Sequence, residues 1–365
     1  MYESFFDLNV RPFDLTPNPR FLFMTPGHRE ALSAIEYGIS GRKGLTLLVG
    51  PAGTGKTTLV HAALERQQGV EAAAIYLTNP TLTRDEFFQF LAFEVGLPGA
   101  EAKSKTLILR ELHAALLDRH KAGRLTALVV DEAQAMSDEL LEELRLLENL
   151  ETASEKLLPV VLVGQIELID RLRQPALLAL KQRIALRATL SPLSARETAA
   201  YIAERIRIAG GDVRGIFTPE AVAAICESSG GIPRNISVIC DNAMVGGFAL
   251  DEKPIGVATI AEVCRDFDLP LPRLATAAQA TTDDFVDAAT ALAEGGPRTA
   301  LVAPMPMTMP MTSLQMSSVP PPSERLVLEV PAEEPPPPRR LRLPHLSLPA
   351  RVRGLRSLFA RTAPR

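Results

Sequence analysis

The feature that most constrains this chain is a glycine-rich stretch at residues 50–57, which reads Gly-Pro-Ala-Gly-Thr-Gly-Lys-Thr. Its fixed positions match the phosphate-binding pattern G-x-x-x-x-G-K-[ST]. The apolar run 45–49 before it predicts a buried strand, and residues 58–64 after it predict a helix. Because strand, loop and helix agree, the pattern favours a phosphate-binding loop over a chance glycine turn.

The residue types in this loop explain how it could bind an anion. Glycines let backbone N–H groups turn inward without a Cβ clash, and the N-terminus of the following helix adds partial positive charge. Lys56 should reach the β- and γ-phosphates of a nucleotide, and the Thr57 hydroxyl should ligate Mg²⁺. The predicted nucleotide contacts in the loop are Gly50, Pro51, Ala52, Gly53, Thr54, Gly55, Lys56, Thr57 and Thr58.

A second chemical stretch lies at residues 125–134, where a buried apolar strand ends in Asp131-Glu132. An aspartate at the tip of such a strand can hold the Mg²⁺ shell in phosphate-loop NTPases. The adjacent glutamate is then placed to activate the attacking water as general base. A solvated acidic turn is the alternative reading, and the phosphate loop upstream favours the metal and base roles.

The order of expected elements predicts an α/β fold of the P-loop NTPase kind, with a parallel sheet flanked by helices over residues 1–193. One of these helices should begin after Ser137 and run through Leu150, with Glu143 and Glu148 among the glutamates expected to face solvent. Over residues 194–269 helices follow helices, so a small helical lid is expected.

The two ends of the chain differ from this central part. Residues 1–27 are rich in Phe and Pro and should be extended, with their rings packed on the following domain or forming a wall of an adenine pocket. Residues 270–338 are predicted to form a Pro-rich disordered linker. Residues 339–365 are Arg-rich and carry no acidic residue, so they form either a solvated disordered tail or a basic segment that docks on an anionic membrane surface or a partner protein.

The composition of the chain indicates the cellular compartment in which it is expected. The three cysteines are widely spaced, without a C-x-x-C pair, which suits a reducing cytosol and argues against a disulfide framework or a zinc site. The N-terminus has no basic n-region, and no apolar run reaches 18 residues, so neither a signal peptide nor a transmembrane helix is expected. The expected location is cytoplasmic, with peripheral attachment at the inner membrane as the alternative.

Residues 1–268 resemble the AAA+ ATPases of the ExeA/GspA (general secretion pathway protein A) family. The matching stretches are 2–8, 12–13, 17–22, 28–32, 50–57, 130–134, 162–165, 180–184 and 231–236. The two nucleotide motifs are shared by many ATPases, whereas the Phe/Pro pattern near the N-terminus is more specific to this family. Longer family members continue into a transmembrane helix and a peptidoglycan-binding domain, where this chain has its Pro-rich and Arg-rich stretches.

The resemblance implies roles for further residues. Gln165 would act as the first sensor, and Arg234 would be the second sensor that reaches the γ-phosphate from the lid. His28 and Arg29 would border the adenine. Arg183 would be an arginine finger that acts on the ATP of a neighbouring subunit in a homo-oligomer, with a structural ion pair as the competing interpretation. The sequence has no Asn-Lys-x-Asp motif of the kind that reads guanine, so ATP with Mg²⁺ is the expected ligand.

Two functions stay open on these grounds. The first is an ATP-driven switch that serves a secretion, pilus or exopolysaccharide assembly. The second is a DNA-associated ATPase of the transposition-helper or initiator type, which usually carries a basic DNA-reading surface after the lid. Here the lid has slightly more acidic than basic residues, so DNA is the less favoured partner.

The basic tail can be tested directly. Deletion of residues 339–365 should abolish binding to anionic liposomes and to DNA, because attraction to phosphate groups depends on clustered positive charge and weakens with salt. Co-sedimentation with liposomes and gel shift at two salt concentrations measure this. Binding that survives the deletion would remove the tail as the docking segment.

Overall fold

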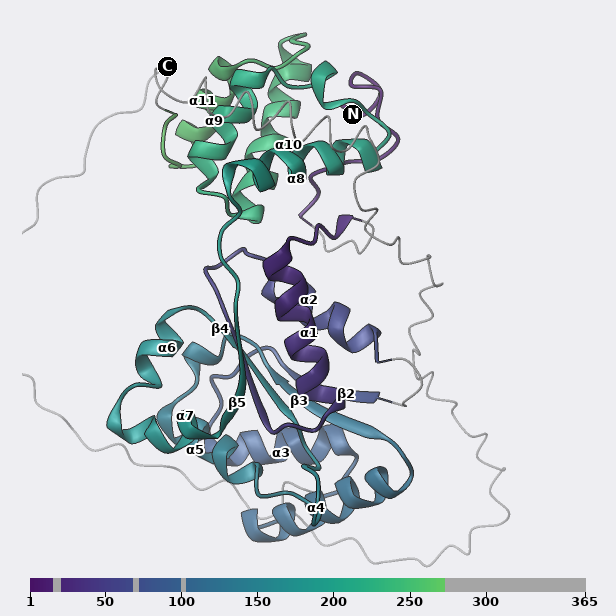
Figure 1. The fold of residues 1–365 in the computed structure, drawn as a ribbon, viewed down its shortest axis with the longest axis vertical. Coiled ribbons are helices and arrows are strands. Elements are labelled where there is room, and N and C mark those ends of the chain that lie inside the picture. The colour runs from purple at the N-terminus through teal and green to yellow at the C-terminus, as the bar shows by residue number, and fades with distance from the viewer. Residues whose placement is uncertain (16–20, 68–71, 100–102, 273–365) are drawn as a thin grey trace, which may run out of the picture. The chain divides into compact units, whose positions relative to one another are not determined.

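The computed structural model of the chain describes residues 1–15, 21–67, 72–99 and 103–272 (Figure 1). Nearly all of the predicted Pro-rich linker and the whole predicted basic tail lie outside these residues. In the part of the chain that the structure covers, no helix is both long and apolar enough to cross a bilayer.

A five-stranded parallel sheet forms the centre of the predicted nucleotide-binding domain, as the sequence indicates. The strand order is β2-β3-β4-β1-β5, so the chain crosses over between non-adjacent strands. The strands are β1 (Leu45–Val49), β2 (Ala72–Leu77), β3 (Leu125–Val130), β4 (Val160–Gly164) and β5 (Ile184–Thr189). Because all strands run the same way, every strand ends at the same edge of the sheet.

Helices cover both faces of this sheet (Figure 1). Side chains alternate along a strand, so Leu47 and Leu48 of β1 belong to two different core clusters, one on each face of the sheet. Burial on both faces explains why the three central strands β1, β3 and β4 are nearly continuous apolar runs, whereas the edge strands β2 and β5 are partly exposed. The helices are α1 (Pro26–Ser40), α2 (Lys56–Glu65), α3 (Arg84–Val95), α4 (Lys105–Lys121), α5 (Asp138–Leu147), α6 (Glu167–Arg171) and α7 (Leu178–Arg183).

Helix α5 differs from the prediction in two ways. It ends at Leu147, not at Leu150. Glu143 and Glu148, expected to face solvent, are 2% and 3% exposed. Glu143 lies three residues after the core leucine Leu140, and Glu148 lies four residues after the core leucine Leu144, so each borders the buried face of the helix. A buried carboxylate requires a positive partner.

The partners of these two carboxylates come from other elements, which the sequence pattern of α5 alone could not show. Lys105 Nζ donates to both carboxylate oxygens of Glu143 at 2.7 Å, and Arg84 of α3 also pairs with Glu143. Glu148 faces Arg183, with 3.7 Å between Arg183 Nη1 and Glu148 Oε2. Burial raises the pKa of Glu148 in spite of this neighbour.

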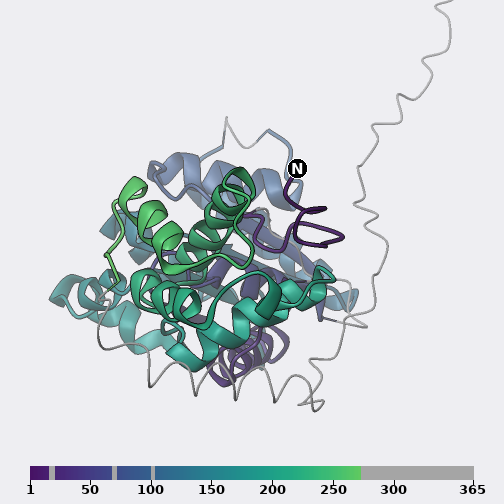
Figure 2. The same cartoon turned by 90° about the horizontal axis from the view of Figure 1, so that it is seen from above.

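Four helices make up the bundle that follows the sheet (Figures 1 and 2). They are α8 (Ala195–Ile208), α9 (Pro219–Ser229), α10 (Pro233–Ala249) and α11 (Val257–Asp266). Ser194 starts α8 with a capping box through Glu197, and Thr218 caps α9 ahead of a proline in the first turn.

The N-terminal segment packs on this bundle, and residues 3–7 form turns where an extended chain was expected. Tyr2, Phe6 and Phe13 are buried in the bundle's core. The backbone N–H of Asn9 donates to Ala209 O at 2.8 Å. The first residues of the chain are therefore structurally part of the helical bundle, although the sheet domain follows them in sequence.

Arg205 of α8 holds the N-terminal segment against the bundle by hydrogen bonds and ring contacts. Its Nε donates to Pro12 O at 2.5 Å, and its Nη1 donates to the Tyr201 hydroxyl at 2.9 Å. The guanidinium also lies over the rings of Phe21 and Phe13, at 4.9 and 5.9 Å from their centroids. One arginine therefore joins two stretches that are almost 200 residues apart in sequence.

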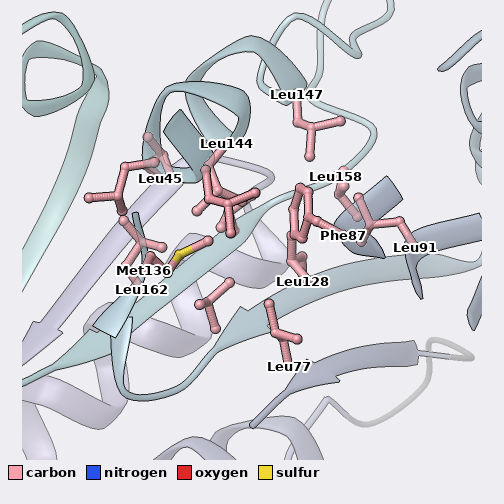
Figure 3. Packing of buried hydrophobic residues seen from close by; sticks show 14 of the residues in the cluster. Leu45, Leu77, Phe87, Leu91, Leu128, Met136, Leu144, Leu147, Leu158 and Leu162 are labelled. Atoms are coloured by element: carbon pink, nitrogen blue, oxygen red, sulfur yellow. The ribbon is translucent and has the colours of Figure 1, made fainter. Parts of the chain in front are cut away.

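Substitution of Phe87, a residue of α3, tests how this helix packs against the sheet (Figure 3). Its ring is fully buried against leucines that include Leu91 and Leu128. Replacement of Phe87 by Ala should destabilise the domain by about 3–5 kcal/mol, because it leaves a cavity in a packed core. Phe93→Ala is the matched control on the same helix, since Phe93 is 77% exposed and its loss should cost less than about 0.5 kcal/mol. Urea denaturation measures both, and equal shifts would contradict this account of the core.

Candidate active site

The phosphate loop joins the end of β1 to the start of α2, as its sequence predicts. Gly53 and Gly55 have φ angles of 79° and 87°, in the left-handed region that glycine tolerates best. Gly55 occupies the N-cap of α2 and has no side chain to cap it. The N–H groups of the first turn of α2 are therefore open to an anion.

Lys56 lies folded back over this loop. Its Nζ donates to Gly50 O and Pro51 O, both at 2.9 Å. The side chain is 6% exposed, and burial lowers its pKa, while the charges of Glu132 and Asp131 act in the opposite direction. The ammonium is therefore held at the loop by two neutral carbonyls that phosphate oxygens can replace.

Thr57 and Asp131 meet across the sheet edge. The Thr57 hydroxyl donates to Asp131 Oδ2 at 2.7 Å, although 74 residues separate the two in sequence. Hydroxyl and carboxylate oxygens are hard donors of the kind Mg²⁺ prefers, and this ion usually completes its shell with water and phosphate oxygens. Over the described ranges no group of three or more His, Cys, Asp or Glu side chains gathers, so a cation here would depend on such additional ligands.

Glu132 directly follows Asp131 and faces the same space. Its backbone has a φ of 50°, which is uncommon for a residue with a side chain. Its Oε2 accepts hydrogen bonds from the amide of Gln134 and, at 3.4 Å, from Gln165 Nε2. The predicted base and the predicted first sensor are therefore in contact.

A cavity of about 460 Å³ lies over the phosphate loop. Its lining combines the loop, Glu132, two stretches of the N-terminal segment, one residue of α1, and residues on or just before helices α8 and α10 of the bundle. The lining residues are Asp14, Leu15, Phe21–Phe23, His28, Ala52–Leu59, Glu132, Leu193, Tyr201, Arg205, Pro233, Arg234 and Ser237. The structure thus brings most of the predicted site residues to one cavity.

Arg234 reaches this cavity from the start of α10. Its backbone N–H donates to Gly53 O at 3.3 Å. A Cβ atom at Gly53 would lie 2.8 Å from Cβ of Arg234, so this approach of the bundle to the loop requires glycine. Arg234 therefore sits where a lid residue could contact a phosphate.

Of the two residues predicted to border adenine, one lines the cavity. His28 is buried, and burial lowers its pKa below the ordinary 6.5. Its Nε2 lies 3.4 Å from Thr54 O, and its Nδ1 lies 2.7 Å from the Thr25 hydroxyl. Because a carbonyl only accepts, the neutral ring donates from Nε2 to the phosphate loop. Arg29 instead donates from Nη1 to Met24 O at 2.8 Å and is not among the lining residues.

Arg183 lies away from this cavity, at the last residue of α7. The next residue, Ile184, pairs with Leu45 at the start of β1, whereas the phosphate loop follows the end of β1. Arg183 Nη1 donates to Asn149 Oδ1 at 3.3 Å beside its ion pair with Glu148. The structural ion pair is thus present, and a role as arginine finger, which stays a prediction, would require the site of another subunit.

Several residues at the site were not predicted, among them Gln134, Tyr201 and Arg205. Gln134 follows Glu132 by two positions, so its place in the motif was a usable signal. Tyr201 and Arg205 reach the cavity because α8 packs against the N-terminal segment, and their spacing on a helix indicates only a shared face.

Comparisons with known proteins agree with this geometry. A family model described as an AAA domain matches residues 39–172. General secretion pathway protein A of Aeromonas hydrophila is 43% identical over 249 residues, which are 68% of this chain and 45% of that protein. Among solved structures, the ORC2 protein of Aeropyrum pernix in ADPNP–ADP complexes superposes with a TM-score of 0.54 at 18% identity, over 71% of each chain. Cdc6p of Pyrobaculum aerophilum gives 0.55 at 15% identity, over 70% of each chain.

The fold and the phosphate loop together define an AAA-domain P-loop NTPase, and the predicted fold class is confirmed. The likeness to ORC2 and Cdc6p shows the fold alone, because both identities are below 20%. The 43% identity to General secretion pathway protein A over 249 residues confirms the resemblance to the ExeA/GspA family that is seen in the sequence. The chain spans less than half the length of that relative.

The titration of His28 should make the free energy of unfolding depend on pH. Its pKa is lower in the folded chain than in the unfolded chain, so the unfolded state binds the proton more readily as the pH falls below about 6.5. Stability should therefore decrease from pH 7 towards pH 5, and His28→Gln should flatten this slope. Urea titrations at several pH values measure it. Parallel slopes for the two proteins would contradict a buried neutral His28.

Proposed function

We propose that the chain binds and hydrolyses ATP in the presence of Mg²⁺ and works as a nucleotide-driven switch for a secretion or envelope assembly. One observation carries the catalytic part of this proposal: the Thr57 hydroxyl contacts Asp131 at 2.7 Å, beside a lysine on the phosphate loop and a glutamate in the cavity. This is the set of groups that phosphoryl transfer to water needs at one place.

Each residue has a distinct task in this proposal. Lys56 leaves the carbonyls of Gly50 and Pro51 and contacts the β- and γ-phosphates, where its charge offsets that of the transferring group. Glu132 accepts the proton of the attacking water. Gln165 orients that water, and Arg234 contacts the γ-phosphate from the bundle. Thr57 and Asp131 would hold Mg²⁺, which when bound neutralises charge on the phosphate oxygens.

The nucleotide would act as a switch through the bundle. Arg234 and Gly53 join the bundle to the phosphate loop, so a change at the γ-phosphate has a direct contact through which to move α10. We further propose a homo-oligomer in which Arg183 of one subunit completes the site of the next. The exposure of Arg183 and its distance from its own cavity suit that arrangement.

The proposed partner follows from the name of the relative. General secretion pathway protein A is named for secretion, and we propose a partner in a secretion, pilus or exopolysaccharide assembly. The cytoplasmic location at or near the inner membrane is proposed from the sequence. The DNA-associated alternative has less support, because the likeness to ORC2 and Cdc6p is one of fold.

Two substitutions test the hydrolysis. Glu132→Gln should keep ATP binding and lower turnover by about 10²–10⁴-fold, because the amide cannot accept the proton. Lys56→Ala should lose tight ATP binding, because a buried positive charge at the phosphates is removed. Phosphate release and fluorescent-nucleotide binding separate the two effects. Hydrolysis by Glu132→Gln close to that of the wild type would exclude Glu132 as the base.

A further inference from the structure

The side chain of Gln134 connects two parts of the site. Its Oε1 accepts from the backbone N–H of Gln165 at 3.0 Å, and its Nε2 donates to Glu132 Oε2. The assignment of the two amide ends follows from their partners, since an N–H group only donates and a carboxylate only accepts. A single amide therefore spans the gap between the end of β3 and the end of β4.

The loop that carries Gln134 is held by other contacts. Arg171 of α6 donates from Nη1 to Gln134 O at 2.7 Å and to Met136 O at 2.8 Å, and it pairs with Asp138. The Ala135 N–H donates to Glu132 O at 2.8 Å. These bonds hold the backbone of the loop, so the amide of Gln134 is not needed for that purpose.

Glu132, in contrast, needs a fixed partner. Its side chain is exposed to the cavity and has three rotatable bonds, so without contacts it would sample several rotamers. A neutral amide can hold the carboxylate by a hydrogen bond without the positive charge that would make it a weaker base. An arginine or lysine at position 134 would also hold the Glu132 carboxylate, but its positive charge would lower the basicity of that carboxylate.

From these contacts we infer that Gln134 is a positioning residue. It orients the Glu132 carboxylate and links it by hydrogen bonds to Gln165, the residue that directly follows β4. This inference rests on the proposed function, because it assigns Glu132 its proposed role as base. Gln134 does not touch the nucleotide cavity itself, and it acts through Glu132. Its loss should therefore lower kcat and leave nucleotide affinity unchanged.

Two variants separate this role from a structural one. Gln134→Met keeps the length of the side chain and removes both hydrogen bonds. Gln134→Glu keeps an acceptor for the Gln165 N–H, but places a second carboxylate against Glu132. Gln174→Met is the matched control, since Gln174 is exposed on the loop after α6. All three are compared with the wild type in steady-state ATP hydrolysis, binding of a fluorescent ATP analogue and thermal unfolding.

We expect kcat to fall about ten- to a hundred-fold in Gln134→Met and Gln134→Glu, which is part of the range that general base catalysis contributes. KM and analogue affinity should stay within about twofold, and the control should match the wild type. In the Glu132→Gln background, Gln134→Met should cause no further loss, because both changes act through one group.

The outcomes distinguish the inference from the proposed function. Turnover by both Gln134 variants at the wild-type rate would overturn the inference and leave the proposed function intact. A further loss in the double variant would also overturn it, because the effect would then be structural. If Gln134→Met unfolds, Gln134→Glu decides alone, since it retains the bond to β4. A wild-type chain with no turnover would overturn both.

Discussion

The site depends on the parallel pairing of β1, β3 and β4. This pairing aligns the carboxyl ends of the three strands at one edge of the sheet, so the residues that follow them meet in space. The phosphate loop follows β1, Asp131-Glu132 follows β3 and Gln165 follows β4. The contacts from Thr57 to Asp131 and from Gln165 to Glu132 both depend on this register. Apolar side chains on both faces of the strands hold it in place.

The helical bundle contributes the opposite wall of the cavity, and it does so together with the first residues of the chain. Arg205 binds Pro12 and lies over Phe13 and Phe21, so the N-terminal segment is joined to α8 by hydrogen bonds and by cation–π contacts. Phe21–Phe23 in turn line the cavity. A displacement of the bundle would therefore carry part of the cavity wall with it. This gives the proposed switch a physical connection between nucleotide and lid.

Much of this could be predicted from the sequence, because local signals here agree with the tertiary structure. The strand before the phosphate loop, the helix cap at Ser137 and the strand that ends in Asp131 each carry a pattern with one main interpretation. Glu143 and Glu148 did not follow the prediction, because a glutamate on a helix is expected outside unless a positive partner from another element is known. The motif shows that Gln134 is near Glu132, but it could not show the bond from Gln134 to Gln165, because Gln165 follows a different strand.

The sequence by itself determined the chemistry: the glycines of the loop, the lysine and threonine that end it, and the acidic pair all follow from short spacings that backbone geometry enforces. Only the tertiary structure decided which of these groups share a cavity and what accompanies them. Arg29 and Arg183 have suitable chemistry, yet neither is among the residues that line the cavity, whereas Tyr201 and Arg205 line it. The physical reason is that a motif specifies its own backbone, while contacts between distant segments depend on how sheet, bundle and N-terminal segment bury their apolar surfaces together.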